Sequence, residues 1–188
     1  MRRKPMLEPL LVDALRKHSQ TISFCESLTA GLASARVAAI PGASDVLRGG
    51  LITYATDLKI ALAGVEAEVV EREGVVSAAV AREMARGCRQ ACGSDWAVAL
   101  TGVAGPDLQD GHPVGEVWIG LAGPNWTASS LAADLLPPSQ TRFALVPDTA
   151  EPQRVIAGTR NDIRNSAVDA ALIGVLHALG EQTEGLIR

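Results

Sequence analysis

The 188-residue sequence has few aromatic residues and no excess of positive charge. Phenylalanine, tryptophan and tyrosine together make up 3% of it, and the formal net charge at pH 7 is −4. Single-strand nucleic-acid binders stack bases on aromatic side chains, and duplex binders neutralise phosphates with a broad basic surface. Both scarcities argue against direct binding of nucleic acids, so we expect a small molecule or a protein as partner.

Cysteines and long apolar runs are scarce as well. The three cysteines are an odd number, whereas secreted disulfide scaffolds usually carry more, in pairs. Cys88 and Cys92 lie four residues apart on one predicted helix face, which indicates two packed thiols, and no side chains have the spacing of a metal site. No stretch resembles a signal peptide or a membrane span. We therefore expect a reduced, cytoplasmic protein that contacts no membrane and needs no metal or cofactor.

What the sequence does contain is the composition of one globular domain over 1–188, with 47% hydrophobic and 20% charged residues. Apolar periodicity predicts helices over 7–18, 29–39, 57–64, 66–73, 77–92 and 160–179. It predicts strands over 20–26, 47–55, 95–100, 115–123 and 126–133, the last two forming a hairpin. Residues 134–157 contain three prolines within 137–147 and show no dominant period, so we expect an irregular segment there. The order of elements predicts an α/β fold, a three-layer α/β/α sandwich with a mixed sheet.

Details within two of these elements are also predictable. The pair Gly49-Gly50 inside a strand indicates a bulge or a close backbone approach. Ser77 is a good N-cap for the helix over 77–92, and Gly93 is a good residue to end it. Asp57 is expected to cap the short helix that follows the second strand.

The first segment that could carry chemistry is CESLTAG, residues 25–31, at a strand-to-helix junction. A hydroxyl there faces unpaired backbone N–H groups and the positive end of a helix. These donors could hold a phosphate, or the oxyanion that forms when Ser27 attacks a carbonyl. The ordinary alternative is that Ser27 or Thr29 only caps the helix.

A nucleophilic serine needs a base, and the sequence offers few. None of the three histidines has a carboxylate in a recognisable partner pattern: His18, His112 and His177. Lysine is equally rare, and only Lys59 lies in a promising segment, since Lys4 and Lys17 lie near the N-terminus and at a helix end. These absences favour Ser–Lys chemistry, in which a desolvated neutral lysine takes the proton.

Tyr54, the only tyrosine, ends a predicted strand shortly before Lys59. Its phenol could relay a proton or lower the pKa of the lysine. The alternative is a solvated Lys59 paired with Asp57.

Two further segments could bind a ligand. The loop TGVAGP, residues 101–106, follows a buried strand, and ligands of open α/β sheets gather where strand ends meet such loops. A tight turn without a ligand explains the loop equally well. Arg160 and Arg164 open the last helix and suit a phosphate or a carboxylate, although solvated helix arginines are the commoner case.

Together these segments resemble one family. CESLTAG, PGASDVLRGGLITYATDLKIALAGV, GVVSAAVAREMARG, TGVAGP and HPVGEVWIGLAG follow the order of the CinA carboxy-terminal domain family, over about residues 7–123 and again in the final helix. The family includes nicotinamide-nucleotide amidase and a domain of competence/damage-inducible proteins. The resemblance implies a homo-oligomer that hydrolyses the carboxamide of nicotinamide mononucleotide to nicotinate mononucleotide and ammonia. It matches Ser27 to the nucleophile, Lys59 to the lysine and Tyr54 to the tyrosine of the family.

The residues expected to bind substrate lie in the same segments. They are Glu26, Thr29, Ala30, Gly31, Arg48, Gly49, Thr101, Gly102, Ala104 and Gly105. Three features depart from the family's usual pattern: Ala30 replaces a glycine, Ala55-Thr56 replaces Ser-Asn, and the loop over 106–114 lacks a glycine pair. A positive φ at position 30 would strain the alanine. These departures favour a second hypothesis, a CinA-like protein that binds a nucleotide or a partner in competence or the DNA-damage response without turnover.

Overall fold

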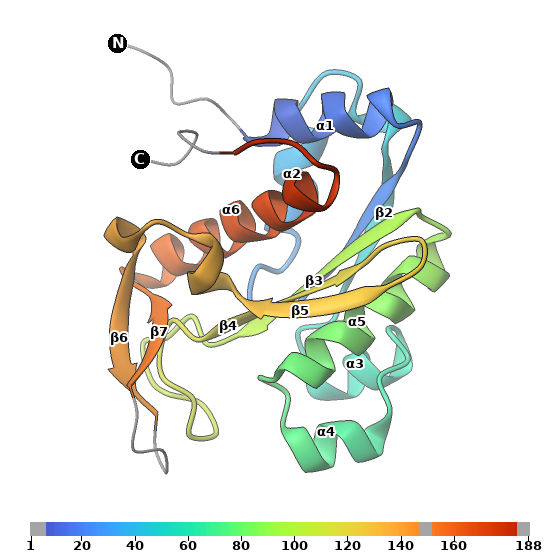
Figure 1. The fold of residues 1–188 in the computed structure, drawn as a ribbon. Coiled ribbons are helices and arrows are strands. Elements are labelled where there is room, and N and C mark those ends of the chain that lie inside the picture. Colours follow the sequence, from blue (N-terminus) through green and yellow to red (C-terminus); the bar gives the residue numbers. More distant parts are fainter. Residues whose placement is uncertain (1–6, 147–151, 184–188) are drawn as a thin grey trace.

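A five-stranded mixed sheet forms the centre of the protein (Figure 1). The computed structural model describes residues 7–146 and 152–183. The strands follow the order β2-β1-β3-β4-β5, and their bounds are β1 Ile22–Glu26, β2 Leu47–Ile52, β3 Trp96–Gly102, β4 Val117–Ala122 and β5 Thr127–Leu131. β1 pairs in parallel with β2 and β3, whereas β4 pairs antiparallel with β3 and β5. The predicted mixed sheet and hairpin are confirmed.

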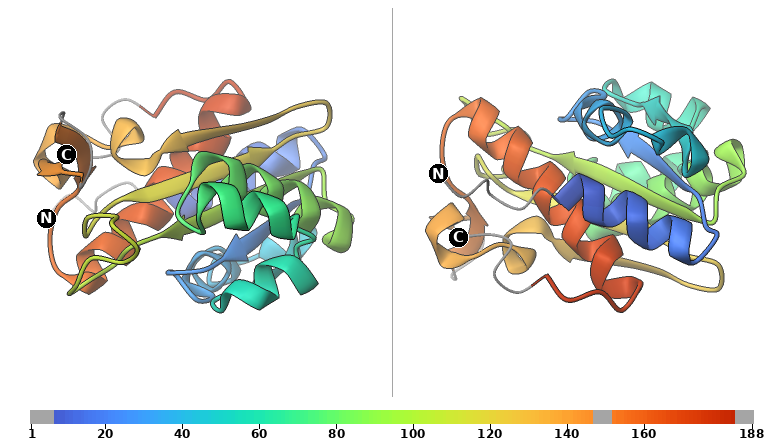
Figure 2. Two further views of the ribbon diagram at one scale, coloured as in Figure 1. Left: turned by 90° about the horizontal axis from the view of Figure 1, so that it is seen from below. Right: turned by 90° about the horizontal axis from the view of Figure 1, so that it is seen from above.

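Helices cover both faces of the sheet (Figures 1 and 2). One face carries α1 (Leu7–Lys17), α2 (Leu32–Ala38) and α6 (Arg160–Ala178), and the other carries α3 (Thr56–Ala61), α4 (Ala67–Glu73) and α5 (Ala78–Cys92). The predicted three-layer α/β/α sandwich is therefore confirmed. Within the described residues, no helix is long and apolar enough to cross a membrane.

Side chains of β3 alternate between two hydrophobic cores. Val98 and Leu100 belong to the core beneath α1, α2 and α6, while Ala97 and Ala99 face α5. The small alanines let α5 approach the sheet closely, and at Gly120 an added Cβ would lie 1.9 Å from a backbone oxygen of α5. This close packing holds the first turns of α5 against the sheet, and with them the segment that precedes the helix.

Most local predictions are confirmed. Ser77 caps α5 through its hydroxyl, and Gly93 ends that helix in the left-handed conformation. The β1–β2 register shifts by one residue between Ile22 and Ser23, and a Cβ at Gly50 would lie 2.6 Å from the Phe24 carbonyl, so both the bulge and the close approach are present. The sulfurs of Cys88 and Cys92 lie 4.0 Å apart, as packed thiols.

Two helix starts were placed incorrectly. α2 begins at Leu32 rather than near residue 29, because residues 28–31 form a turn and Gly31 is the N-cap with φ +94°. α3 begins at Thr56 with Ala55 as N-cap and no side-chain cap, so Asp57 does not cap it.

Residues 134–157 are more regular than expected. The segment contains a separate antiparallel pair, β6 (Thr141–Leu145) and β7 (Pro152–Ile156), preceded by two 3₁₀ turns over 132–135 and 138–140. No apolar period marks these strands because most of their side chains are at least partly exposed. Val155 and Ile156 alone are fully buried, and the Ile156 N–H donates to the Gly115 carbonyl, which ties the pair to the main body.

Candidate active site

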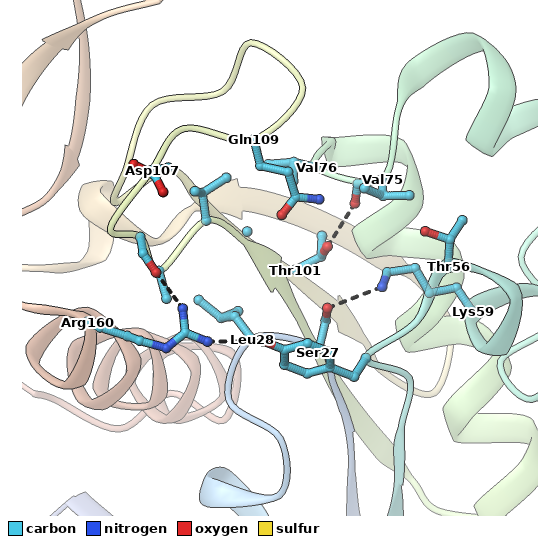
Figure 3. A pocket seen from close by; sticks show the side chains of 15 residues that line it. Ser27, Leu28, Thr56, Lys59, Val75, Val76, Thr101, Asp107, Gln109 and Arg160 are labelled. Carbon is cyan, nitrogen blue, oxygen red and sulfur yellow. Dashed lines mark hydrogen bonds between the residues drawn. The ribbon is translucent and has the colours of Figure 1, made fainter.

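A buried serine–lysine pair lies where β1 ends (Figure 3). Ser27 directly follows β1, and Lys59 reaches it from α3, with 3.1 Å between Lys59 Nζ and Ser27 Oγ. Lys59 is only 2% exposed, and its Nζ also donates to the Thr53 carbonyl at 2.8 Å. The predicted alternative of a solvated lysine paired with Asp57 is therefore wrong. Of the other lysines, Lys17 is exposed on α1 and Lys4 lies outside the described residues.

Burial lowers the pKa of Lys59 below its ordinary value of 10.5, because the charged ammonium loses solvation. A neutral amine has two hydrogens and one lone pair. Donation to the Thr53 carbonyl orients the group, and the lone pair is then available to accept the proton of the Ser27 hydroxyl. The pair thus has the geometry and the electrostatics of a nucleophile with its base.

The turn that carries Ser27 is held by a buried carboxylate. Glu26 is 1% exposed, and its oxygens accept the backbone N–H groups of Gly31, Ala33 and Ser34 at 2.9–3.0 Å. Because Glu26 satisfies the N-terminus of α2, the alternative that Ser27 or Thr29 caps this helix is wrong. The Ser27 N–H donates to the Leu100 carbonyl at 3.0 Å, which fixes the serine against β3.

Tyr54 contacts an arginine rather than the lysine. It is 55% exposed, and its hydroxyl accepts Nη2 of Arg160 at 3.0 Å. Arg160 also donates to the Gly105 carbonyl at 2.5 Å, so it joins the second strand's end to the TGVAGP loop. Arg164 holds the carbonyls of Leu28 and Thr29 at 3.0 and 2.9 Å. Both arginines at the start of α6 therefore have partners at the site, whereas the sequence pattern favours solvated side chains.

A cavity of about 130 Å³ opens above Ser27 and Lys59. The TGVAGP loop forms one wall, and the Thr101 hydroxyl in it donates to the Val75 carbonyl at 2.7 Å. Gly102 is required there, because a Cβ would lie 2.4 Å from the Glu116 carbonyl. Asp107 and Gln109 line the same cavity (Figure 3), although neither was expected from the sequence.

Several predicted binding residues do not line this cavity. Arg48 and Gly49 lie near the beginning of β2, at the opposite end of the sheet from Ser27, and Arg48 donates to the Cys92 carbonyl. Glu26 and Thr29 are buried and do not belong to the cavity lining, and Ala30 and Gly31 lie in the turn before α2. The substrate-binding role proposed for Arg48 and Gly49 does not fit this placement.

One histidine does have a carboxylate neighbour. His112 Nδ1 lies 3.1 Å from Glu116 Oε1, a pair that the sequence pattern did not reveal. Neither residue lines the cavity above Ser27. The serine therefore has Lys59, and not this histidine, as its base candidate.

Ala30 has a φ of +49°, which lies in the left-handed region that favours glycine. The positive φ considered from the sequence is therefore present. We expect Ala30→Gly to stabilise the fold by about 0.5–1 kcal/mol, because relief of roughly 1–2 kcal/mol of strain exceeds the added entropy of an unfolded glycine. Thermal unfolding should show the melting temperature rising by about 2 °C. Ala39→Gly is the matched control, because Ala39 has a right-handed φ of −69°. A lower melting temperature for Ala30→Gly would refute the strain.

The fold and the site therefore define an α/β sandwich with a buried serine–lysine pair beneath a polar cavity. The family model of the CinA C-terminal domain matches residues 5–134. The chain belongs to this family.

Relatives and solved structures agree. The chain is 38% identical over 168 residues to a CinA-like protein of Frankia casuarinae, covering 88% of this chain and 38% of that protein. It is 45% identical over 108 residues to a putative competence-damage inducible protein of Listeria welshimeri, covering 57% and 26%. It thus spans about a quarter to two-fifths of these relatives' length. A crystal structure of the competence damage-inducible protein A of Klebsiella pneumoniae is 26% identical and superposes with a TM-score of 0.76, over 93% of this chain and 95% of that one.

Proposed function

We propose that this chain is an amidase that hydrolyses the carboxamide of nicotinamide mononucleotide to nicotinate mononucleotide and ammonia. The observation that carries the proposal is the 3.1 Å approach of a buried, pKa-lowered Lys59 to the Ser27 hydroxyl at the base of a polar cavity. The choice of amide rests on the family resemblance.

In the proposed mechanism, Ser27 Oγ attacks the carboxamide carbon while Lys59 accepts the hydroxyl proton. Leu28 and Ala104 line the cavity, and their backbone N–H groups donate to no acceptor among the described residues, which makes them candidate donors to the oxyanion. Lys59 then returns the proton to the leaving nitrogen, and ammonia departs. Water, activated by the same amine, hydrolyses the acyl-enzyme and releases the carboxylic acid.

The charges around the cavity fit a mononucleotide. Arg160 donates to the Gly105 carbonyl and the Tyr54 hydroxyl. A guanidinium group has five N–H donors, so others remain for a phosphate. Asp107 adds an exposed carboxylate at the same cavity, a suitable neighbour for a pyridinium ring or ribose hydroxyls. A ligand with one cationic and one anionic end would therefore find Asp107 for its positive charge and Arg160 for its negative charge.

The direct test is to incubate the purified chain with nicotinamide mononucleotide and to measure ammonia. We expect saturable release, and weaker activity on nicotinamide riboside, which lacks the phosphate that Arg160 would hold. No ammonia above the blank at high protein concentration would overturn the proposal.

The second candidate is a family member that binds the mononucleotide without turnover, favoured by the strained Ala30 and by the Tyr54 hydroxyl contacting Arg160 instead of the reacting pair. Calorimetric binding without ammonia release would identify it. Self-association and cytoplasmic location stay predictions.

A further inference from the structure

The arginines of this chain generally have partners that explain their positions. Arg36, for example, contacts Glu8 and Asp169, and Arg164 holds two backbone carbonyls of the turn after β1. Arg86 is the exception: within residues 7–146 and 152–183 it has no hydrogen-bond or ion-pair partner. It is exposed on α5.

Arg86 lies in a hollow of about 230 Å³ between α4, α5 and the start of β5. Two more arginines line it. Arg82, one turn earlier on α5, donates to the Ser129 hydroxyl at 2.9 Å, and Arg72 of α4 forms an exposed ion pair with Glu73. Three arginines from two helices thus line one hollow, in a chain whose net charge is −4.

The hollow contains little negative charge to balance them. Glu83 is the one carboxylate among its lining residues, and its Oε2 accepts the N–H of Glu66 at the start of α4 at 2.9 Å. Arg82 and Arg86 are four residues apart on one helix, a spacing at which like charges repel. An anion bound between the two side chains would be attracted to both and would offset their mutual repulsion.

We propose that this hollow is a second ligand site, which binds a small anion bearing a phosphate group through Arg72, Arg82 and Arg86. Guanidinium groups present paired N–H donors that match phosphate oxygens in a bidentate arrangement. The hollow shares no lining residue with the cavity above Ser27, whose own arginine is Arg160 of α6. The site is therefore independent of the proposed amidase reaction.

The test is isothermal titration of the intact chain with inorganic phosphate and pyrophosphate at constant ionic strength. We expect saturable binding of at least one of them, weakened by about tenfold or more in Arg86→Gln and in Arg82→Gln, because each loses a charge-assisted hydrogen bond. Arg160→Gln separates this site from the catalytic cavity, and Arg48→Gln controls for loss of an exposed charge elsewhere. Arg48→Gln should bind as the parent does. Arg160→Gln should keep the binding that depends on Arg82 and Arg86 and lose only anion held in the catalytic cavity. Thermal unfolding verifies that each variant is folded.

Three outcomes would overturn the proposal. The first is no saturable binding of either anion. The second is binding that Arg160→Gln abolishes and Arg86→Gln does not, because the anion would then occupy the catalytic cavity. The third is an equal loss in Arg48→Gln, which would indicate attraction to surface charge in general.

Discussion

Ser27→Ala is expected to lower the rate of carboxamide hydrolysis by about 10⁴-fold or more, because no acyl-enzyme can form without the hydroxyl. Binding of the mononucleotide should change little, since the Ser27 backbone is held by the Leu100 carbonyl and the turn by Glu26. Ammonia release under single-turnover conditions gives the rate, and calorimetry gives the dissociation constant.

The matched control is Ser34→Ala, which also removes a serine hydroxyl, but from α2, the helix that follows the Ser27 turn. Ser34 Oγ donates to Glu26 at 2.7 Å and lies outside the cavity lining, so its loss should leave the rate within about tenfold of the parent. A Ser27→Ala enzyme that keeps a comparable rate would contradict the acyl-enzyme mechanism and would require direct attack by water.

The serine–lysine pair was predictable because of what the sequence lacks. With three lysines and three histidines, few bases could serve Ser27, and only Lys59 lies in a segment that follows a strand of the same sheet. The parallel pairing of β1 with β2 brings their carboxyl ends to one edge, which is why residues 32 positions apart meet. The same pairing places Arg48 and Gly49 at the other end of β2, away from Ser27.

The remaining parts of the site depend on long-range packing. Arg160 reaches the cavity from the last helix, 106 residues from Tyr54, and an arginine in a helix has the same local pattern whether it is solvated or bound. Val75 and Gln109 come from a helix-preceding segment and a loop without periodicity. Glu26 was predicted to bind substrate, but its carboxylate caps α2. The turn before α2 brings three backbone N–H groups to this side chain. A sequence motif does not show which way the side chain points.

Lys59→Met is expected to lower the activity strongly and to stabilise the protein. Removal of the base should lower the rate of hydrolysis by about 10²–10⁴-fold. Methionine has a similar length and no charge, so it can fill the buried site without the cost of desolvating an ammonium group. In the parent, the rate of hydrolysis should rise with pH as Lys59 loses its proton, with a midpoint below 10.5, and the pH profile of kcat/KM measures this midpoint.

The gain in stability should depend on pH in a defined direction. Because burial lowers the folded-state pKa of Lys59, the lysine destabilises the fold fully below that pKa. The cost declines as pH rises from there to 10.5, since over that range the unfolded chain holds a proton that the folded chain has lost. Denaturant unfolding should therefore show that Lys59→Met raises the free energy of unfolding most at the low-pH end of this range. The gain should disappear near pH 10.5. Lys17→Met is the control, because that side chain is 71% exposed and its replacement should give neither effect. A Lys59→Met advantage that grows with pH would contradict a desolvated amine, and with it the role of Lys59 as base.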